Sequence, residues 1–224
     1  MKRYPDMVRR ENSLDDFIIQ ESKCYEPLDI RAGDTVLDIG ANIGAFTRLA
    51  WEAGAARIIA VEPDPDNCEM FLNNLELLPG SCFQGTIVRT VDLIEAAAVN
   101  DGGPDLRLPL YLNTGKNKGL HSMAEYRGRD TIDVATMSWQ KLLDENPTVI
   151  KIDIEGGEYA LNLTALPSSV RALAIELHLM KKHWREEGAP RVLKQLAAQG
   201  FTPTVAKPGT AKSWTAFYIF HREA

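Results

Sequence analysis

The sequence predicts an α/β fold in which a mostly parallel sheet of seven strands carries helices on both faces. Along most of the 224 residues, short apolar runs alternate with segments of helical periodicity, and Gly, Pro and Asn separate them. Such alternation is typical of βαβ units. A glycine-containing turn at residues 40–44 directly follows one apolar run and precedes a helical segment. The runs are almost continuously apolar, as expected of strands that are buried on both faces.

Length and composition indicate a single domain that spans residues 1–224. The chain is 45% hydrophobic and 25% charged, which is ordinary for a globular protein. Its net charge of −6 argues against nucleic acid as a partner and gives no attraction to anionic membranes. Because no run of about 18 apolar residues occurs, we expect a cytoplasmic protein with no membrane association. Three cysteines, Cys24, Cys68 and Cys82, lack the spacing of a zinc site, and nothing in the sequence indicates an oligomeric state.

The first part of the chain supplies a helical lead-in and three strands. Residues 1–33 are expected to lead into the sheet through a helix over residues 12–29, for which Asn12 and Ser13 are candidate N-caps. Apolar runs and helical patterns then follow in turn. We expect strands over residues 35–38, 57–61 and 91–99 and helices over residues 45–53 and 66–78.

The regular alternation is interrupted between residues 101 and 136. Apolar segments at 106–112 and 131–136 flank a polar, glycine-containing stretch, which predicts a β-hairpin-like insertion. Long loops in a compact domain tend to bind ligands. Beyond the insertion, the pattern predicts strands over residues 148–153, 171–178, 201–206 and 214–220, with helices from about residue 157 and over residues 190–199.

The turn after the first strand has the features of a cofactor-binding loop. Gly40 and Gly44 lack Cβ atoms, so the backbone can turn tightly and approach a ligand, and the next helix presents free N–H groups. Asp38, at the end of the strand, is placed to accept hydrogen bonds from a ligand ammonium group or to orient the loop. Glu62 follows Gly44 by 18 residues, at the end of the second strand. A carboxylate at that place can accept hydrogen bonds from ribose hydroxyls.

Two common nucleotide-binding loops are disfavoured by the same turn. A dinucleotide fingerprint GxGxxG that begins at Gly40 would need glycines where the chain has Asn42 and Ala45. A Walker A loop would end in Gly-Lys-Ser or Gly-Lys-Thr, and this turn does not. A nicotinamide-dependent dehydrogenase is therefore a weaker hypothesis.

Three segments resemble, in order and spacing, the signature segments of the FkbM family of methyltransferases: residues 36–44, 61–63 and 150–158. The resemblance implies a Rossmann-like class I methyltransferase fold whose last strand is antiparallel. It also implies S-adenosyl-L-methionine as the cofactor and O-methylation of a hydroxyl as the usual reaction. The cofactor-binding residues it implies are Asp38, Gly40, Ala41, Asn42 and Gly44 around the methionine part, Glu62 and Pro63 at the ribose, and Ala97 at the adenine.

Charged residues gather at the ends of the fourth and fifth strands, at the sheet edge where open α/β sheets bind ligands. Isoleucines alternate with Lys151, Asp153 and Glu155, which places the three charged residues on one face if the strand stays extended. The next strand carries Glu176 and His178 with the same alternation. Asp153, Glu155 and His178 are the candidate catalytic residues, since each could take a proton from an acceptor. Together with Glu176 they could alternatively hold Mg²⁺ or Mn²⁺, which the sequence leaves open.

Each charged residue also has a structural explanation. Lys151 is expected to form an ion pair with Asp153 or Glu176 rather than to act in catalysis. His178 is equally well explained as a core histidine whose hydrogen bonds are satisfied. His121, in the insertion, is expected to be a surface residue.

The leading functional hypothesis is an O-methyltransferase that acts on a small molecule or glycan. The alternative is an N-methyltransferase of the same fold that acts on a small molecule, nucleotide or nucleic acid, and a catalytically silent scaffold is a third class. No Asn/Asp-Pro-Pro-aromatic motif follows the fourth strand, which weakens the N-methyltransferase hypothesis. Methylation of a nucleic acid would predict a basic patch near the cleft. Its candidates are Lys116, Lys118, Arg127 and Arg129 in the insertion and the segment at residues 181–185.

Overall fold

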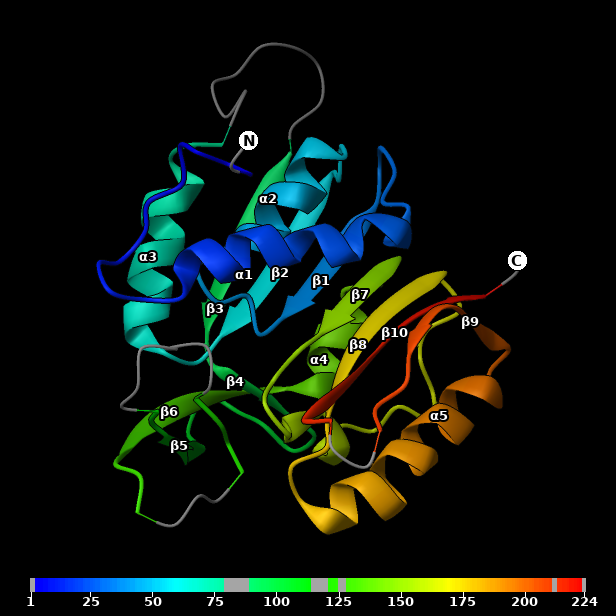
Figure 1. Cartoon of the computed structure of the whole chain (residues 1–224). Coiled ribbons are helices and arrows are strands. Elements are labelled where there is room, and N and C mark those ends of the chain that lie inside the picture. The colour runs from blue at the N-terminus through cyan, green and yellow to red at the C-terminus, as the bar shows by residue number, and fades with distance from the viewer. Residues whose placement is uncertain (1–2, 79–88, 114–120, 125–127, 211–212, 223–224) are drawn as a thin grey trace.

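A computed structural model describes residues 3–78, 89–113, 121–124, 128–210 and 213–222 (Figure 1). Its main layer is a sheet of seven strands in the order β3-β2-β1-β7-β8-β10-β9. β10 runs antiparallel to both of its neighbours, whereas the other neighbouring strands are parallel. The expected α/β fold with an antiparallel last strand is thus confirmed. The strands are β1 (Thr35–Ile39), β2 (Arg57–Glu62), β3 (Thr90–Glu95), β7 (Val149–Ile152), β8 (Ala172–His178), β9 (Phe201–Lys207) and β10 (Thr215–Arg222).

Helices cover both faces of this sheet because its central strands bury side chains on both sides. Val36 and Leu37 are adjacent in β1 and both fully buried, yet they belong to different apolar clusters. Val36 shares a cluster with residues of α2 and the 3-10 helix η1, and Leu37 shares one with residues of α4 and α5. Successive side chains of a strand point to opposite faces, which accounts for the division. The helices are α1 (Asp15–Glu21), η1 (Ser22–Leu28), α2 (Ala45–Glu52), α3 (Pro65–Leu75), α4 (Trp139–Asp144) and α5 (Ala189–Ala197).

The N-terminal lead-in is helical, but less regular than the sequence suggests. The α-helix begins at Asp15, after Leu14, and continues as a 3-10 helix that contains Pro27. Proline lacks an N–H group and interrupts the hydrogen bonds of an α-helix. Neither Asn12 nor Ser13 is the N-cap; instead the N–H of Asp15 donates to Ser13 Oγ at 3.2 Å.

The insertion joins the short strand β4, which precedes it, in a second, smaller sheet of the order β4-β6-β5, at the lower left of Figure 1. Its members are β4 (Ala97–Val99), β5 (Arg107–Tyr111) and β6 (Thr131–Ser138). β5 and β6 are antiparallel, as the predicted hairpin requires. The expectation of one continuous strand over residues 91–99 is wrong. The N–H of Ala96 makes the last hydrogen bond to β2, at Glu62, and the following Pro63 has no N–H to continue the ladder, so β4 pairs with β6.

The helix expected from about residue 157 is only a single 3-10 turn, η3 (Gly157–Ala160). Glu158 lies in this turn with its side chain wholly buried, and Leu161 is already extended. The buried carboxylate accepts the N–H groups of Gly156 and of His178 in β8, so a contact with the sheet fixes this turn. The sequence also misses α4 and the π-helical turn η4 (Trp184–Gly188) before α5.

Several residues considered above lie outside the described part of the chain: Cys82, Lys116, Lys118 and Arg127. The two cysteines within it, Cys24 and Cys68, are free thiols. Among the described helices, none has the length and apolar character that crossing a bilayer requires.

Candidate functional site

A cavity of about 300 Å³ opens at the carboxyl ends of β1, β2, β7 and β8, with α1 and η1 forming one wall. This is the edge of an open α/β sheet at which ligands bind. Most of the predicted site residues line it: Gly40, Ala41, Asn42, Glu62, Pro63, Ala97, Asp153, Glu155 and His178. Two predicted residues, Asp38 and Gly44, lie outside its lining.

The glycine turn is fixed by close backbone contacts. Gly40 has φ +81°, and a Cβ atom built on it would lie 1.9 Å from the carbonyl oxygen of Asp153. The N–H groups of Gly40 and Ala41 both donate to the carbonyl of Val61, at 2.9 and 3.1 Å. Gly44 has φ +86° and faces the ring of Phe71 rather than the cavity. Both positions therefore need glycine: a larger residue at Gly40 would clash with the backbone that follows β7, and one at Gly44 would press against Phe71 of α3.

Asp38 stabilises the glycine turn indirectly, because it binds Lys151, which in turn binds the turn. The carboxylate is fully buried, with Oδ1 3.2 Å from Lys151 Nζ, while Thr47 Oγ1 donates to Oδ2 at 2.8 Å. Lys151 Nζ also donates to the carbonyl of Gly40 at 2.5 Å. Burial opposes the charge of Lys151, but the nearby carboxylates, Asp38 foremost, outweigh it and raise the pKa of the ammonium. The expected ion pair of Lys151 exists, but its partner is Asp38 and not Asp153 or Glu176.

Glu62 joins the glycine turn to the start of α3. Its Oε2 accepts the N–H of Asn42 at 2.9 Å, and its Oε1 accepts the Asp64 N–H and the Asn67 Nδ2, both at 3.1 Å. Burial raises the pKa of Glu62, and these three hydrogen bonds offset only part of that effect. Each carboxylate oxygen has two lone pairs, so Glu62 retains capacity to accept hydrogen bonds from the cavity side.

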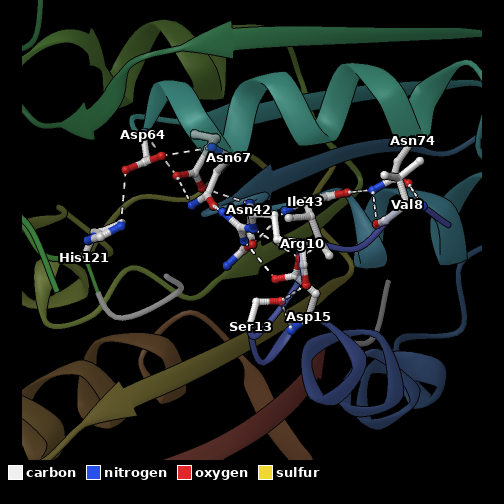
Figure 2. Close-up of polar contacts among 11 residues, drawn as sticks. Val8, Arg10, Ser13, Asp15, Asn42, Ile43, Asp64, Asn67, Asn74 and His121 are labelled. Atoms are coloured by element: carbon white, nitrogen blue, oxygen red, sulfur yellow. Dashed lines mark hydrogen bonds and ion pairs between the residues drawn. The ribbon is translucent and has the colours of Figure 1, made fainter. Parts of the chain in front are cut away.

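The inserted segment returns to this end of the sheet through His121 (Figure 2). Asp64 caps α3 by accepting the N–H of Asn67 at 2.9 Å, and its other oxygen lies 3.3 Å from His121 Nε2. Asn113 donates its N–H to His121 Nδ1 at 2.8 Å, which leaves Nε2 as the protonated nitrogen. The His121 side chain is only 7% exposed and lines the cavity. The expectation that His121 is a surface residue is therefore wrong.

The N-terminal segment is tied to the same region by Arg10. Its guanidinium donates to Asn67 Oδ1 at 2.8 Å and to the buried Asp15 at 2.8 Å (Figure 2). Farther along α3, Asn74 accepts the N–H of Val8 at 2.6 Å and donates to the carbonyl of Ile43. These contacts hold the lead-in against α3 and the glycine turn, which positions α1 over the cavity.

At the opposite side of the cavity, His178 lies between two carboxylates. Its Nε2 is 3.1 Å from Glu155 Oε2, and its Nδ1 is 3.1 Å from Glu158 Oε1. Burial by itself would lower the pKa of His178, but the hydrogen bonds and charges of the two glutamates outweigh burial and raise it well above its ordinary value. The hydroxyl of Tyr25, from η1, donates to Asp153 Oδ2 at 3.3 Å. His178 is thus a buried histidine with a partner at each ring nitrogen, and it also lines the cavity.

The remaining carboxylates of this wall are poorly solvated. Burial raises the pKa of Glu155, and the hydrogen bond from His178 opposes the rise. Burial, followed by the charge of Asp153, raises the pKa of Glu176 to about 8. The alternation of charges along β7 ends earlier than expected, because the strand stops at Ile152 and Glu155 has φ +52°. Even so, Lys151, Asp153 and Glu155 all line the cavity.

The mouth of the cavity is apolar, and a second hollow adjoins it. Phe17, Met180 and Trp214 line the mouth with exposed fractions of 58%, 39% and 73%. The hollow, of about 560 Å³, shares Met123, Gly157 and Ala160 with the cavity. Its other lining residues include the stacked rings of Tyr159 and Trp184 and the basic side chains of Lys181 and Arg191.

Comparison with known proteins identifies a family and a fold. The model of the methyltransferase FkbM domain matches residues 38–202. No curated protein matches the chain significantly. Among solved structures, the FkbM methyltransferase of Methylobacillus flagellatus is 16% identical, with a TM-score of 0.53 over 96% of this chain and 56% of that one.

Two further solved structures share the fold at low identity. The precorrin-6y C5,15-methyltransferase of Geobacter metallireducens is 14% identical, with a TM-score of 0.52 over 99% of this chain and 97% of that one. The precorrin-8w decarboxylase of Methanobacterium thermoautotrophicum is 12% identical, with a TM-score of 0.51 over 91% and 90%. At such identities the likeness extends to the fold alone.

Proposed function

This chain belongs to the FkbM family of S-adenosylmethionine-dependent methyltransferases, and we propose that it methylates a hydroxyl oxygen of a small molecule or glycan. The proposal rests on one observation: residues suited to hold the cofactor and residues suited to hold the acceptor line the same cavity. The glycine turn and Glu62 line one side, and Asp153, Glu155 and His178 line the other. A cofactor held at the first group would present its methyl carbon to an acceptor held at the second.

The first group suits the three parts of S-adenosylmethionine. Gly40, Ala41 and Asn42 offer a close backbone approach for the methionine part. Oε2 of Glu62 has one lone pair left for a ribose hydroxyl, and the small apolar side chains around Ala97 leave space for a flat adenine ring. In this assignment Asp38 acts through Lys151 to orient the loop and does not touch the cofactor.

The second group would align and deprotonate the acceptor. Bound S-adenosylmethionine supplies a methyl carbon that its sulfonium already activates, so alignment of the acceptor oxygen provides most of the acceleration. A His178 held protonated by two carboxylates cannot accept another proton, which leaves Asp153 or Glu155 as the base. The acceptor oxygen forms the new C–O bond as the C–S bond breaks, and the hydroxyl proton passes to the carboxylate. The products are a methyl ether and S-adenosylhomocysteine.

Methylation of a neutral amine is the second candidate. The same carboxylates that accept a hydroxyl proton could accept one from an ammonium group before transfer. The wall of the cavity carries Glu21 as well as Asp153 and Glu155, which favours small cationic acceptors over a polyanion such as nucleic acid.

The first experiment is a thermal melt of the protein with S-adenosylhomocysteine, S-adenosylmethionine or NAD⁺. A ligand at about a hundred times its Kd stabilises the fold by about 2.7 kcal/mol, which amounts to several degrees at this size. The two adenosyl ligands should raise the melting temperature and NAD⁺ should not. A shift with NAD⁺ alone would contradict the proposal.

A matched pair of variants then tests the cofactor side. Glu62→Gln keeps the size of the side chain but removes its charge, whereas Glu69→Gln makes the same change at an exposed position of α3. Loss of a hydrogen bond to a charged group costs about 1.5–3 kcal/mol, so S-adenosylhomocysteine should bind about 10- to 150-fold more weakly to Glu62→Gln. Equal affinities of the two variants would remove Glu62 from the site. Methyl transfer to panels of hydroxyl and amine compounds, followed by mass spectrometry, separates the two candidate reactions.

A further inference from the structure

Asp153, Glu155 and His178, which lie at neighbouring strand ends in the cavity wall, bring atoms that can bind a metal ion close together. Asp153 and Glu155 follow β7, and His178 ends β8. One carboxylate oxygen from each acid and one ring nitrogen of His178 all lie within 4.8 Å of one another. In an octahedral site with bonds of about 2.1 Å, adjacent ligand atoms are about 3 Å apart and opposite ones about 4.2 Å apart. Small side-chain movements would therefore bring these atoms to ligating distances.

His178 is held from behind in the orientation that such a site needs. Glu158, which is wholly buried and does not line the cavity, lies at its Nδ1. The same carboxylate accepts the N–H of His178 at 2.7 Å and the N–H of Gly156 at 2.8 Å, so its position is fixed by the backbone. Nε2 therefore faces Glu155 and the cavity, and an ion bound there would displace the proton that His178 holds on Nε2 in the metal-free protein. A carboxylate at the far nitrogen is the usual support of a metal-binding histidine.

Acidic side chains outnumber lysines in the described part of the cavity wall. Within the described part of the chain, five acidic residues line the cavity: Glu21, Glu62, Asp153, Glu155 and Glu176. The lysine that lines it, Lys151, is bound to Asp38 beneath the loop. Asp153 and Glu155 are partly buried, and a divalent cation bound between them would offset the cost of withdrawing their charges from water.

We propose that Asp153, Glu155 and His178 bind a divalent cation of the Mg²⁺ or Mn²⁺ class. Two carboxylate oxygens and one imidazole nitrogen form a set that suits these ions and leaves coordination positions open toward the cavity. The role of the ion rests on the proposed function: an acceptor hydroxyl bound at an open position would be held in place for transfer and would lose its proton more readily, to the second carboxylate oxygen of Asp153 or Glu155. The preferred acceptors are then molecules with two adjacent oxygens, such as vicinal diols, which can chelate the ion.

The test measures binding of Mn²⁺ to the full chain by electron paramagnetic resonance, because free Mn²⁺ gives a signal that bound Mn²⁺ loses. The protein is first stripped with EDTA, and the EDTA is removed. One Mn²⁺ should bind per chain, and Mg²⁺ should compete for it. In Asp153→Asn and in Glu155→Gln the site should be lost, while Glu69→Gln, at an exposed position of α3, should bind as the unaltered protein does.

Glu158→Gln provides an independent variant, because it changes the support of His178 and no proposed ligand. Loss of such a supporting carboxylate typically weakens metal affinity about 10- to 100-fold. Thermal melts of each variant establish that it is folded. Should Asp153→Asn not fold, the comparison of Glu158→Gln with Glu69→Gln still decides the question.

Titration of the same stripped protein with S-adenosylhomocysteine separates this inference from the proposed function. Binding of S-adenosylhomocysteine without saturable Mn²⁺ binding overturns the metal site and leaves methyl transfer standing. Mn²⁺ binding that Asp153→Asn and Glu158→Gln abolish or weaken supports the metal site, whether or not S-adenosylhomocysteine binds. Mn²⁺ binding of equal strength in all variants places the ion elsewhere and overturns the proposal.

Discussion

Glu158 lies directly behind His178 and binds both its ring and its backbone. Oε1 of the glutamate is 3.1 Å from Nδ1 and accepts the His178 N–H at 2.7 Å, and both side chains are buried. The pair joins the turn after β7 to the end of β8. It therefore fixes which ring nitrogen of His178 faces the cavity, and Glu158 is a positioning residue for this side of the site.

Removal of the charge behind His178 should lower its pKa. In Glu158→Gln the amide can still accept a hydrogen bond from Nδ1, but it no longer offers a negative charge to the imidazolium. The titration of His178, followed by NMR in metal-free protein labelled at histidine, should move to lower pH. Glu69→Gln should leave that titration where it is. An unchanged titration in Glu158→Gln would show that Glu155 alone sets the charge of His178.

Glu176 should make the metal-free protein less stable as the pH rises. Burial and then the charge of Asp153 raise its pKa to about 8, with Glu21 adding to the rise and His178 and the Thr215 hydroxyl opposing it. Its folded pKa lies above the unfolded value of about 4.3, so the stabilisation is complete below that value and is lost as the pH rises through about 8.

Urea unfolding of the wild type and of Glu176→Gln between pH 5 and pH 9 measures this effect. A shift of this size corresponds to a few kcal/mol, on the order of 1.4 kcal/mol per pKa unit. The free energy of unfolding should fall less steeply with pH in Glu176→Gln than in the wild type. Parallel pH profiles for the two proteins would contradict the expectation.

Lys151→Met should cost much more stability than Lys182→Met. Lys151 is buried against the fully buried Asp38, whereas Lys182 is exposed and lies 3.8 Å from the exposed Glu186. Removal of one partner of a buried ion pair typically costs about 3–5 kcal/mol because the other charge remains uncompensated. The free energy of unfolding in urea should fall by about that amount for Lys151→Met and change little for Lys182→Met. Adding Asp38→Asn to Lys151→Met should restore part of the loss, and an unrestored double variant would argue against the pairing.

Gly40→Ala should be far more damaging than Gly33→Ala, although both glycines have a positive φ. The new Cβ atom at Gly40 would meet the Asp153 carbonyl at 1.9 Å, whereas at Gly33 nothing lies within 4 Å. Gly33→Ala should therefore cost only the conformational term, about 1–2 kcal/mol. Gly40→Ala should cost several kcal/mol more or prevent folding, as measured by urea unfolding and by soluble yield. Equal losses of stability in the two variants would mean that the backbone at Asp153 shifts to accommodate the new methyl group.

The local features of the site could be predicted from the sequence, whereas its long-range contacts could not. The glycine turn at residues 40–44 and the carboxylate of Glu62 are recognisable because strand ends and turns follow from nearby residues. The partner of Lys151 was predicted wrongly, since Asp38 lies 113 residues away and is reached only through the pairing of β1 with β7. The contact of Tyr25 with Asp153 likewise depends on where the lead-in packs.

The order of the seven main-sheet strands along the chain, the glycine turn and the family are recognisable in the sequence, because each follows from periodicity and local motifs. Three features depend on the folded arrangement instead: the contact of Glu158 with His178, the nearly buried His121 side chain beside Asp64, and the break between β3 and β4 at Ala96. A buried polar group must find a partner wherever the fold brings one within reach. Such partners are set by strand pairing and layer packing, which no short stretch of sequence contains.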